Sequence, residues 1–468
     1  MRPAAPAAYT TALPPPGDRR CDITVFGCTG NAGRSVAFHV VRSAAASSKP
    51  ISVGLAGRSR DRVEKVLSGI FSELEGVSAD DVDVHVLIAD ASDAPSMLSM
   101  AQSSRVVAAC AGPYGRYGEA AVVACIEGRA HYLDITGEVP WVARMANEYG
   151  SAAEEAGVAL LPFSGYDCVP AELGMAMAGA ALEEHCGEGS ARMATLNLAF
   201  RNKGGGFPRG TLETIMDSFE GKTPDRKDGD ARFYRKEYKS TVKNALSPVN
   251  LIRPKWSDQA GTYTGPNLMT SVNVPVLCRS APTLGFSGDL VISDRSIVSG
   301  RASIMNGWGL IPTVIYTGVL VAGGLSMALP PFRWWLKRKL RTYSYGGDRR
   351  GKIFLHAQAL PAPASGAGKW GGPSATARCM YPGDAGIYAT GLFAAAVAHA
   401  LLDATSAGSG LQAPLAGFHS PVAALHRCGG GLLVRRLRDI GAEIEVRVVP
   451  SEGAEEMLVD ATELRSRL

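Results

Sequence analysis

Residues 23–34 read Ile-Thr-Val-Phe-Gly-Cys-Thr-Gly-Asn-Ala-Gly-Arg, a short apolar run followed by three regularly spaced glycines. The pattern predicts a β-strand, a tight turn and a helix that begins near residue 31. A turn without side chains lets the backbone approach a pyrophosphate, and the first N–H groups of the helix then face the phosphates. The spacing is G-x-x-G-x-x-G rather than G-x-G-x-x-G, so this motif alone leaves a nucleotide site and an ordinary glycine-rich loop equally open. The expected cofactor contacts in the turn are Gly27, Thr29, Gly30, Asn31 and Gly33.

The next segment extends the turn to a strand–helix–strand unit. A helix is expected at 36–46 and a second strand at 51–57, which together make a βαβ unit with a parallel sheet. In such a unit an acidic residue often follows the second strand and binds the ribose hydroxyls. Arg58 and Ser59 stand there instead, and a guanidinium can bind a 2′-phosphate that a carboxylate would repel. The sequence therefore predicts NADP(H), with NAD(H) second. The alternative is that Arg58 only solvates a loop.

Four further strands are expected along the first part of the chain, at 82–88, 105–110, 131–135 and 158–163. Ligands of open α/β sheets bind beyond the carboxyl ends of the strands. The last three of these strands are followed by glycine together with a tyrosine or a carboxylate. Gly112 and Pro113 therefore join the expected cofactor contacts. Asp90, which follows the first of the four strands, either lies near the adenine or caps a helix.

The same strand ends carry the candidate catalytic side chains. Hydride transfer needs a proton donor within hydrogen-bond reach of the substrate. Side chains able to orient a substrate or move a proton follow the strands at Tyr114, Tyr117, Glu119, Asp134, Glu138, Tyr166 and Asp167. From this set we select as candidate catalytic residues Tyr114, Tyr117, Glu119 and Asp167. The structural alternatives are that Asp134 and Glu138 cap a helix and that Asp167 fixes a turn.

Five segments, by their order and spacing, resemble the saccharopine dehydrogenase-like oxidoreductases. They are residues 25–34, 55–59, 111–119, 132–138 and 164–174, with a further match at 383–390. The resemblance is to the branch with the mammalian saccharopine dehydrogenase-like oxidoreductase and the mycobacterial trans-acting enoyl reductases. It implies an NAD(P)-dependent oxidoreductase whose relatives associate with lipid bodies or act on lipids. The likeness is weakest between 220 and 370, so the lysine-pathway activity of saccharopine-forming enzymes is not carried over.

Composition and cysteine usage point to an intracellular globular protein. The 468 residues are 46% hydrophobic and 20% charged, enough for two or three domains. Nine cysteines form no C-x-x-C pair and eight histidines do not cluster, so no metal site is expected and the thiols fit a reducing compartment. Residues 1–20 are rich in Ala and Pro and are expected to form a disordered arm. A secretory signal is not expected there, whereas targeting to a mitochondrion or another organelle stays open.

An apolar stretch followed by a basic one stands out in the second half of the chain. Residues 302–332 contain no charged side chain, while 333–352 contain eight basic residues and one acid. Three interpretations of 313–329 compete: a buried helix, a hairpin or helix lying on a membrane or lipid droplet, and a spanning helix. Tryptophans suited to a lipid interface flank the stretch at positions 308, 334 and 335. The basic run suits anionic headgroups and lacks the features of a nucleic-acid site. A lipid surface bound through 308–341 is therefore an expected partner.

The chain is expected to be an α/β protein with a Rossmann-type doubly wound parallel sheet, a second mixed α+β domain, and a C-terminal helix that returns to the first domain. Strands are expected near 268–278 and 353–359, and a long helix at 384–405. The expected division is a disordered arm at 1–20, an NADP-binding Rossmann domain at 21–175, a substrate or dimerisation domain at 176–380 with a hydrophobic segment at 308–336, and a segment packed on the Rossmann domain at 381–468. A homodimer is left open.

Two functional hypotheses follow. The first is an NAD(P)-dependent reductase that acts on a lipid, glycolipid-related or other apolar substrate at a membrane or lipid-droplet surface. The second is a non-catalytic nucleotide-binding scaffold associated with a lipid droplet or membrane. Both are compatible with the glycine turn, and only turnover separates them.

Overall fold

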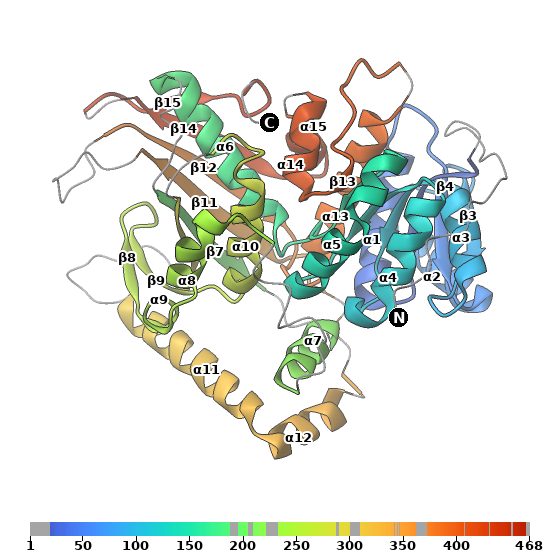
Figure 1. Cartoon of the computed structure of the whole chain (residues 1–468), viewed down its shortest axis with the longest axis horizontal. Helices are drawn as coiled ribbons and strands as arrows, with labels where there is room; N and C mark the ends of the chain where they lie inside the picture. The colour runs from blue at the N-terminus through green and yellow to red at the C-terminus, as the bar shows by residue number, and fades with distance from the viewer. Residues whose placement is uncertain are drawn as a thin grey trace.

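The computed structural model describes most of the chain, and its described part contains two β-sheets joined by helices (Figure 1). The described residues are 19–187, 195–204, 209–220, 233–286, 290–299, 309–340, 342–343, 345, 347–361, 372–406, 408–429, 431–450 and 453–464. The expected N-terminal arm lies outside these residues up to position 18, as do Trp308 and Arg341 of the expected lipid-binding segment.

The first sheet contains seven parallel strands in the order β13-β6-β5-β4-β1-β2-β3. The strands are β1 (Cys21–Phe26), β2 (Val53–Gly57), β3 (Val84–Ile88), β4 (Ser104–Ala109), β5 (His131–Asp134), β6 (Ala159–Leu161) and β13 (Gly417–Phe418). The arrangement 3-2-1-4-5-6 is the Rossmann order, with the ligand crevice where the order reverses at β1 and β4. The predicted doubly wound sheet is confirmed, and it gains β13 at one edge.

Helices cover both faces of this sheet, as a buried parallel sheet requires. They are α1 (Asn31–Ala45), α2 (Arg60–Glu73), α3 (Ala94–Gln102), α4 (Tyr114–Glu127), α5 (Val139–Ala156) and α13 (Tyr388–Ala404). The predicted C-terminal helix that returns to the first domain is α13, which packs along α1. Gly391 on α13 lies so close to α1 that a Cβ there would be 2.7 Å from the backbone carbonyl carbon of Ser35. All residues of α13 except Tyr388 and Asp403 are buried.

The second sheet is mixed, with eight strands in the order β15-β14-β12-β11-β7-β10-β9-β8. They are β7 (Thr195–Lys203), β8 (Lys255–Ser257), β9 (Thr262–Pro266), β10 (Val291–Ile297), β11 (Lys352–Leu360), β12 (Ser374–Pro382), β14 (Glu443–Val449) and β15 (Met457–Val459). Only β7 and β10 pair in parallel. Helix α6 (Val169–Cys186) packs on one face at Gly174, where a Cβ would meet that of Ala357 at 2.8 Å.

Further helices lie along the chain outside the two sheets. They are α7 (Arg209–Phe219), α8 (Lys239–Ala245), α9 (Pro248–Ile252), α10 (Thr270–Ser280), α14 (Pro421–Leu425) and α15 (Leu432–Asp439), with 3-10 turns at Lys236–Tyr238 and His426–Cys428. The strand predicted near 268–278 is wrong, because α10 occupies this segment. Its alternating valines suggested a strand, yet nearly all of α10 is buried, so packing on several sides overrides the β-propensity of valine. The strand predicted at 353–359 is confirmed as β11.

The division of the chain differs from the expected one at two places. The expected boundary at 175 falls inside α6. The segment 381–468 divides between the sheets, because α13 and β13 join the Rossmann part whereas β14 and β15 extend the second sheet. Side-chain alternation along β14 resembles that of any half-buried strand, so the sequence does not tell which sheet it joins.

Helices α11 (Leu310–Ala328) and α12 (Pro330–Leu340) form an arm at the bottom of Figure 1, and we call them the α11–α12 arm. Near its start α11 packs against β9, and Thr313 and Thr317 are its only buried residues. Within the described residues α11 is the one helix that is long and apolar enough to cross a membrane, with mean hydropathy 1.7. Such an exposed helix does not match the interpretation of 313–329 as a buried core helix.

Candidate functional site

The glycine turn after β1 is built for close approach of backbone to backbone. Gly27 has φ +80°, and a Cβ there would lie 2.9 Å from the amide nitrogen of Ala111 at the end of β4. A Cβ on Gly33 would collide with the carbonyl oxygen of Gly27. At Gly30, by contrast, a Cβ would meet only the Gly27 oxygen at 3.6 Å. Folding therefore requires two of the glycines, whereas Gly30 leaves open space in front of α1.

The N-terminus of α1 faces this open space without a side-chain cap. Gly30 is the N-cap residue and accepts from the Arg34 amide through its carbonyl oxygen, so the turn closes on backbone alone. Uncapped N–H groups and the positive end of the helix dipole favour phosphate oxygens at this position. The Asn31 side chain is already used, since its Nδ2 donates to the carbonyl oxygen of Tyr345 at 3.0 Å. Thr29 belongs to the same turn, and its Cγ2 lies beside Gly57 at the end of β2.

Arg58 stands exposed immediately after β2 and makes no hydrogen bond or ion pair with any described residue. Ser59 follows as the N-cap of α2 and makes no side-chain capping bond. Asp90 lies near enough for Arg58 to help lower its pKa, although the backbone N–H of Ser92 is the larger cause. The Asp90 carboxylate accepts from both the amide and the hydroxyl of Ser92, at 3.0 and 2.8 Å. Asp90 thus shapes a turn, and the Arg58 guanidinium is free of partners among the residues that the structure describes.

The Tyr114 hydroxyl is hydrogen-bonded to the protein backbone on both sides. It donates to the carbonyl oxygen of Ala109 at 2.9 Å and accepts from the Ile135 amide at 3.3 Å. Burial raises the pKa of this phenol well above its ordinary value. The expected catalytic role of Tyr114 therefore does not fit, because the hydroxyl joins the ends of β4 and β5. Glu138 caps α4 by accepting from the amides of Tyr114 and Gly115 at 2.9 and 3.0 Å. The Gly112–Pro113 pair leads into that helix.

Tyr117 and Glu119 lie further along α4. Glu119 accepts from Arg144 at 3.1 Å and from the Tyr149 hydroxyl at 2.7 Å, and both partners belong to α5. Tyr117 is 46% exposed. Glu119 thus fastens α4 to α5, which gives it a structural role in place of the expected catalytic one. Side-chain direction on a helix, which depends on where the helix begins, was not available from the strand-end pattern.

Asp134 organises the carboxyl end of β5. Its buried carboxylate accepts from the Tyr132 hydroxyl at 2.7 Å and from the amides of Thr136 and Phe163 at 2.9 and 3.2 Å. Burial is the main reason that its pKa is raised to about 7. Phe163 has φ +63°, a conformation that a bulky side chain rarely adopts and that concentrates at functional sites. The ends of β5 and β6 are therefore held together by one carboxylate.

Asp167, after β6, is the strand-end carboxylate whose proton is available. Its Oδ2 lies 3.0 Å from the position of a Cβ on Gly137, and Val272 of α10 lies beside the same point. Within the described residues its carboxylate accepts no hydrogen bond, and it is only partly buried. Burial alone raises its pKa to about 7, so protonated and ionised forms coexist near neutral pH. These are the properties of a general acid.

Beside Asp167 the Rossmann part meets the second sheet. The Tyr166 hydroxyl accepts from Nδ2 of Asn202 on β7 at 3.0 Å, and the Tyr166 amide donates to Thr390 of α13 at 3.4 Å. Tyr316 of α11 packs against Gly265 and is hydrogen-bonded by Ser296 of β10. Asn202 and Tyr316 are not among the residues expected from the sequence. No local pattern marks them, because β7 and α11 reach the strand ends only through the tertiary fold.

The parallel sheet, the 3-2-1-4-5-6 order and the uncapped glycine turn define a Rossmann-type dinucleotide-binding protein. The turn fits a pyrophosphate and the free guanidinium of Arg58 fits a 2′-phosphate, so the residues present suit NADP(H). In the described part of the chain, no group of His, Cys, Asp or Glu is placed to hold a metal ion.

Residues 23–161 match the family described as saccharopine dehydrogenase NADP binding domain, which supports the binding of NADP by this segment. The chain is 31% identical over 207 residues to a lipid droplet localized protein of Caenorhabditis elegans, which covers 44% of this chain and 47% of the relative. It is 37% identical over 155 residues to the saccharopine dehydrogenase-like oxidoreductase of Mus musculus, covering 33% and 36%. These matches confirm the predicted family resemblance and the predicted cofactor.

A Mycobacterium tuberculosis protein named as a candidate trans-acting enoyl reductase is 32% identical over 200 residues, covering 42% of this chain and 44% of the relative. The chain thus spans less than half the length of each of these curated relatives in its matches. Among solved structures, saccharopine dehydrogenase (L-Glu forming) from Saccharomyces cerevisiae aligns over 92% of this chain and 100% of that chain, with 13% identity and a TM-score of 0.46.

Proposed function

We propose that this protein is an NADP-dependent oxidoreductase that reduces an apolar, lipid-linked substrate at the surface of a membrane or lipid droplet inside the cell. The observation that carries the proposal is the position of α11. One side of its first turns packs on Gly265 of β9 through Thr313, Tyr316 and Thr317, while large apolar side chains are exposed along the whole helix. One helix therefore joins the second sheet, whose Asn202 binds Tyr166, to a surface that suits lipid.

The exposed side chains of the arm give it the character of an interfacial helix. Among the large apolar residues, Val319 and Leu325 are 65% and 67% exposed, and Trp334 on α12 is 66% exposed. Exposed apolar surface of this extent marks an interaction site. Arg338 and Lys339 follow on α12 and are exposed as well, which suits anionic headgroups. The name of the Caenorhabditis elegans relative supports a lipid-droplet surface for this chain.

Residues at different strand ends bind different parts of the cofactor and substrate. The uncapped start of α1 at Gly30 binds the pyrophosphate, and Arg58 binds the 2′-phosphate and so selects NADPH over NADH. When bound, NADPH supplies a hydride. Asp167 supplies the proton that completes the reduction, and its side chain is then a carboxylate. Tyr166, held by Asn202, positions the substrate beside it.

The pKa of Asp167 sets an expected pH dependence. Because the pKa is about 7 and the acid form is the active one, kcat/KM for reduction falls tenfold per pH unit above about pH 7 and levels off below it. Asp167→Asn removes the ionisable group, so the residual activity loses this inflection.

The experiment is NADPH oxidation by the full chain with vesicles made from a total cellular lipid extract. We expect oxidation with the wild type and a loss of at least about 100-fold in Asp167→Asn, in line with the usual contribution of general acid catalysis. Asp439→Asn, an exposed substitution on α15, is the matched control and keeps wild-type activity. If Asp167→Asn oxidises NADPH as fast as this control, Asp167 does not have the proposed role.

The alternative is a non-catalytic nucleotide-binding scaffold on the same lipid surface. The structural roles of Tyr114 and Glu119 favour it, because two of the four candidate catalytic side chains are used for packing. It predicts NADPH binding, seen as a raised melting temperature, with no oxidation for any lipid extract. Equal small shifts in melting temperature with NADPH and NADH would contradict the assignment of NADPH as the cofactor, for the oxidoreductase and for the scaffold alike.

A further inference from the structure

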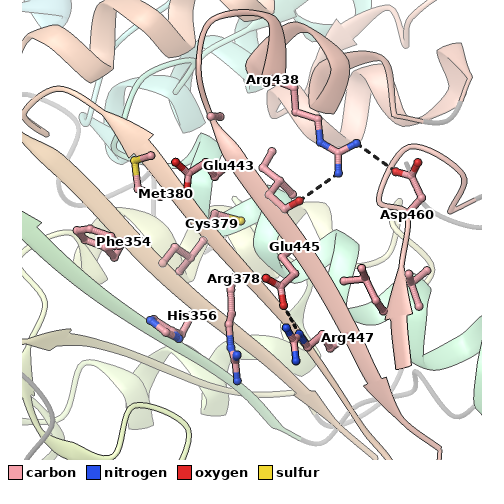
Figure 2. Close-up of a pocket in the computed structure, with 15 residues that line it drawn as sticks. Phe354, His356, Arg378, Cys379, Met380, Arg438, Glu443, Glu445, Arg447 and Asp460 are labelled. Atoms are coloured by element: carbon pink, nitrogen blue, oxygen red, sulfur yellow. Dashed lines mark hydrogen bonds and ion pairs between the residues drawn. The ribbon is translucent and has the colours of Figure 1, made fainter. Parts of the chain in front are cut away.

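The second sheet carries a hollow of about 810 Å³ on the face opposite α6, and the candidate site does not use it. Figure 2 shows side chains of β11, β12 and β14 in this hollow. Leu355 of β11 packs against Gly174 of α6, so the neighbouring Phe354 points to the other face and into the hollow. Met380 stands directly opposite Phe354 on β12 and adds a second apolar side chain. A hollow of this volume suits a small-molecule ligand.

Cations gather around Phe354 at the edge of the hollow. The guanidinium carbon of Arg201 on β7 lies 4.9 Å from the centre of the Phe354 ring, and Nζ of Lys203 lies 5.6 Å from it. Lys352 stands directly opposite Lys203 in the antiparallel pair of β7 and β11. Like charges in opposite positions destabilise a sheet. A bound anion would remove this repulsion.

Arg378 of β12 brings a further guanidinium into the hollow, as Figure 2 shows. Its register partners are His356 on β11 and Glu445 on β14, and the charge of Glu445 is compensated by Arg447 of its own strand. Arg201 and Arg378 each make no hydrogen bond or ion pair with a described residue, and Nε of each is shielded from solvent. Shielded guanidinium donors without an acceptor are typical of an anion site.

The other acids that line the hollow leave its positive end uncompensated. Asp460 pairs with Arg438 at 3.1 Å. Glu443 stands opposite Met380, which separates it from Phe354. Four cations at the β7–β11–β12 end make no ion pair with a described residue, and they are Arg201, Lys203, Lys352 and Arg378. The excess of positive charge therefore lies at this end.

We infer that this hollow binds the phosphate group of a soluble phosphorylated small molecule, between Arg378 on β12 and the cations Arg201 and Lys203 on β7. A guanidinium binds a phosphate through two parallel N–H bonds, and several cations together favour its double charge over the single charge of a carboxylate. Phe354 and Met380 contact the body of the ligand. The inference does not rest on the proposed function, because it involves none of the residues proposed to bind NADPH, substrate or lipid.

The side on which the hollow opens favours a soluble ligand over a lipid headgroup. Residues directly opposite one another on neighbouring strands point to the same face of a sheet. The register leads from Gly265, where the α11–α12 arm packs, through Ser296 and Phe200 to Leu355. Leu355 contacts α6, so the arm packs on the α6 side of the sheet. The hollow opens on the other side, away from the surface proposed to bind lipid.

The test is isothermal titration calorimetry of the full chain with phenyl phosphate as the probe, in saturating NADP⁺ so that the dinucleotide site is occupied. Two charge-assisted contacts predict a Kd of about 1 mM or tighter. We expect Arg201→Gln and Arg378→Gln each to weaken binding by at least about 10-fold. Lys239→Gln removes an exposed cation on α8, and this matched control should keep wild-type affinity.

Two further ligands define the chemistry of the site. Benzoate has the same ring and a single charge, and we expect it to bind at least about 10-fold more weakly than phenyl phosphate. Vesicles of phosphatidic acid should bind the wild type and the double variant Arg201→Gln with Arg378→Gln equally well. Unchanged melting temperatures show that the variants fold.

Three results would overturn the proposal. The first is no saturable binding of phenyl phosphate up to about 10 mM, or binding by Arg378→Gln as tight as that by the wild type. The second is benzoate bound as tightly as phenyl phosphate. The third is a loss of vesicle binding in the double variant, which would assign these cations to lipid headgroups in place of a soluble ligand.

Discussion

Two apolar helices of similar length, α13 and α11, have opposite surroundings. Helix α13 is buried along almost its whole length between α1, the Rossmann sheet and α15. Helix α11 has only two buried residues, although it contains no charged side chain. Small and aliphatic residues predominate in both sequences. Apolar composition therefore predicts that a helix needs a partner, and the fold decides whether protein supplies it.

For α11 the described protein supplies a partner only at one end. Gly265 of β9 lets Thr313 and Tyr316 approach closely, and beyond Thr317 the helix leaves the sheet. Arg333 and Lys337 of α12 pair with Glu220 after α7, which fixes the far end of the arm to the body. The arm is thus held at both ends and exposed between them, as the proposed binding to a lipid surface requires.

A charge placed in each helix gives the largest expected difference. Leu392→Asp buries a carboxylate at a fully buried position of α13 and should cost at least about 4 kcal/mol, enough to prevent folding. Val319→Asp on α11 should change the free energy of unfolding by less than about 0.5 kcal/mol, because the side chain is 65% exposed. Urea unfolding measures both. Destabilisation by Val319→Asp comparable to that by Leu392→Asp would show that protein covers α11.

Replacing one glycine in each helix by alanine should change the stability of the chain by smaller amounts and in opposite directions. Gly391→Ala should cost about 1–3 kcal/mol, because its Cβ would overlap Ser35 on α1. The displaced α1 should also bind NADPH more weakly. Gly323→Ala meets open space and should stabilise the chain by up to about 1 kcal/mol through helix propensity. Thermal unfolding with and without NADPH tests both, and a stabilising Gly391→Ala would contradict the packing of α13 on α1.

The cations of α12 should affect lipid binding and leave folding unchanged. Arg338→Ala with Lys339→Ala should weaken binding to anionic vesicles by roughly 30-fold at low salt, at about 1 kcal/mol per cation. The effect should shrink as salt screens the charges. Lys239→Ala on α8 is the matched control. Vesicle binding that does not respond to the double substitution would assign the attraction to the apolar face alone.

Local patterns predicted the parts of the fold that local chemistry controls. The glycine turn at 27–33 and the alternation along 353–359 each specify their own backbone, so the Rossmann unit and β11 were predictable. The strand expected near 268–278 was wrong, because the valines of α10 are buried by contacts that a periodicity of two cannot reveal. Whether 313–329 is buried or exposed depends on which elements pack on it, so the sequence left that open.

The candidate site was predictable as a place and only partly as a set of side chains. The strand ends were located correctly, since parallel strands bring their carboxyl ends to one edge. Tyr114 and Glu119 stood at the expected positions, yet their side chains are bound to the backbone at Ala109 and to α5. Asn202 and Tyr316 came from distant elements that carry no motif. Side-chain direction and long-range contacts are what sequence alone lacks.

The most direct test of the account is flotation of the full chain with lipid vesicles or isolated lipid droplets. The wild type is expected to float with the lipid. Val319→Asp with Leu325→Asp, which places two carboxylates on the exposed side of α11, should remain at the bottom of the gradient while its melting temperature and NADPH binding match the wild type. Flotation of this variant equal to the wild type would contradict the claim that lipid covers α11.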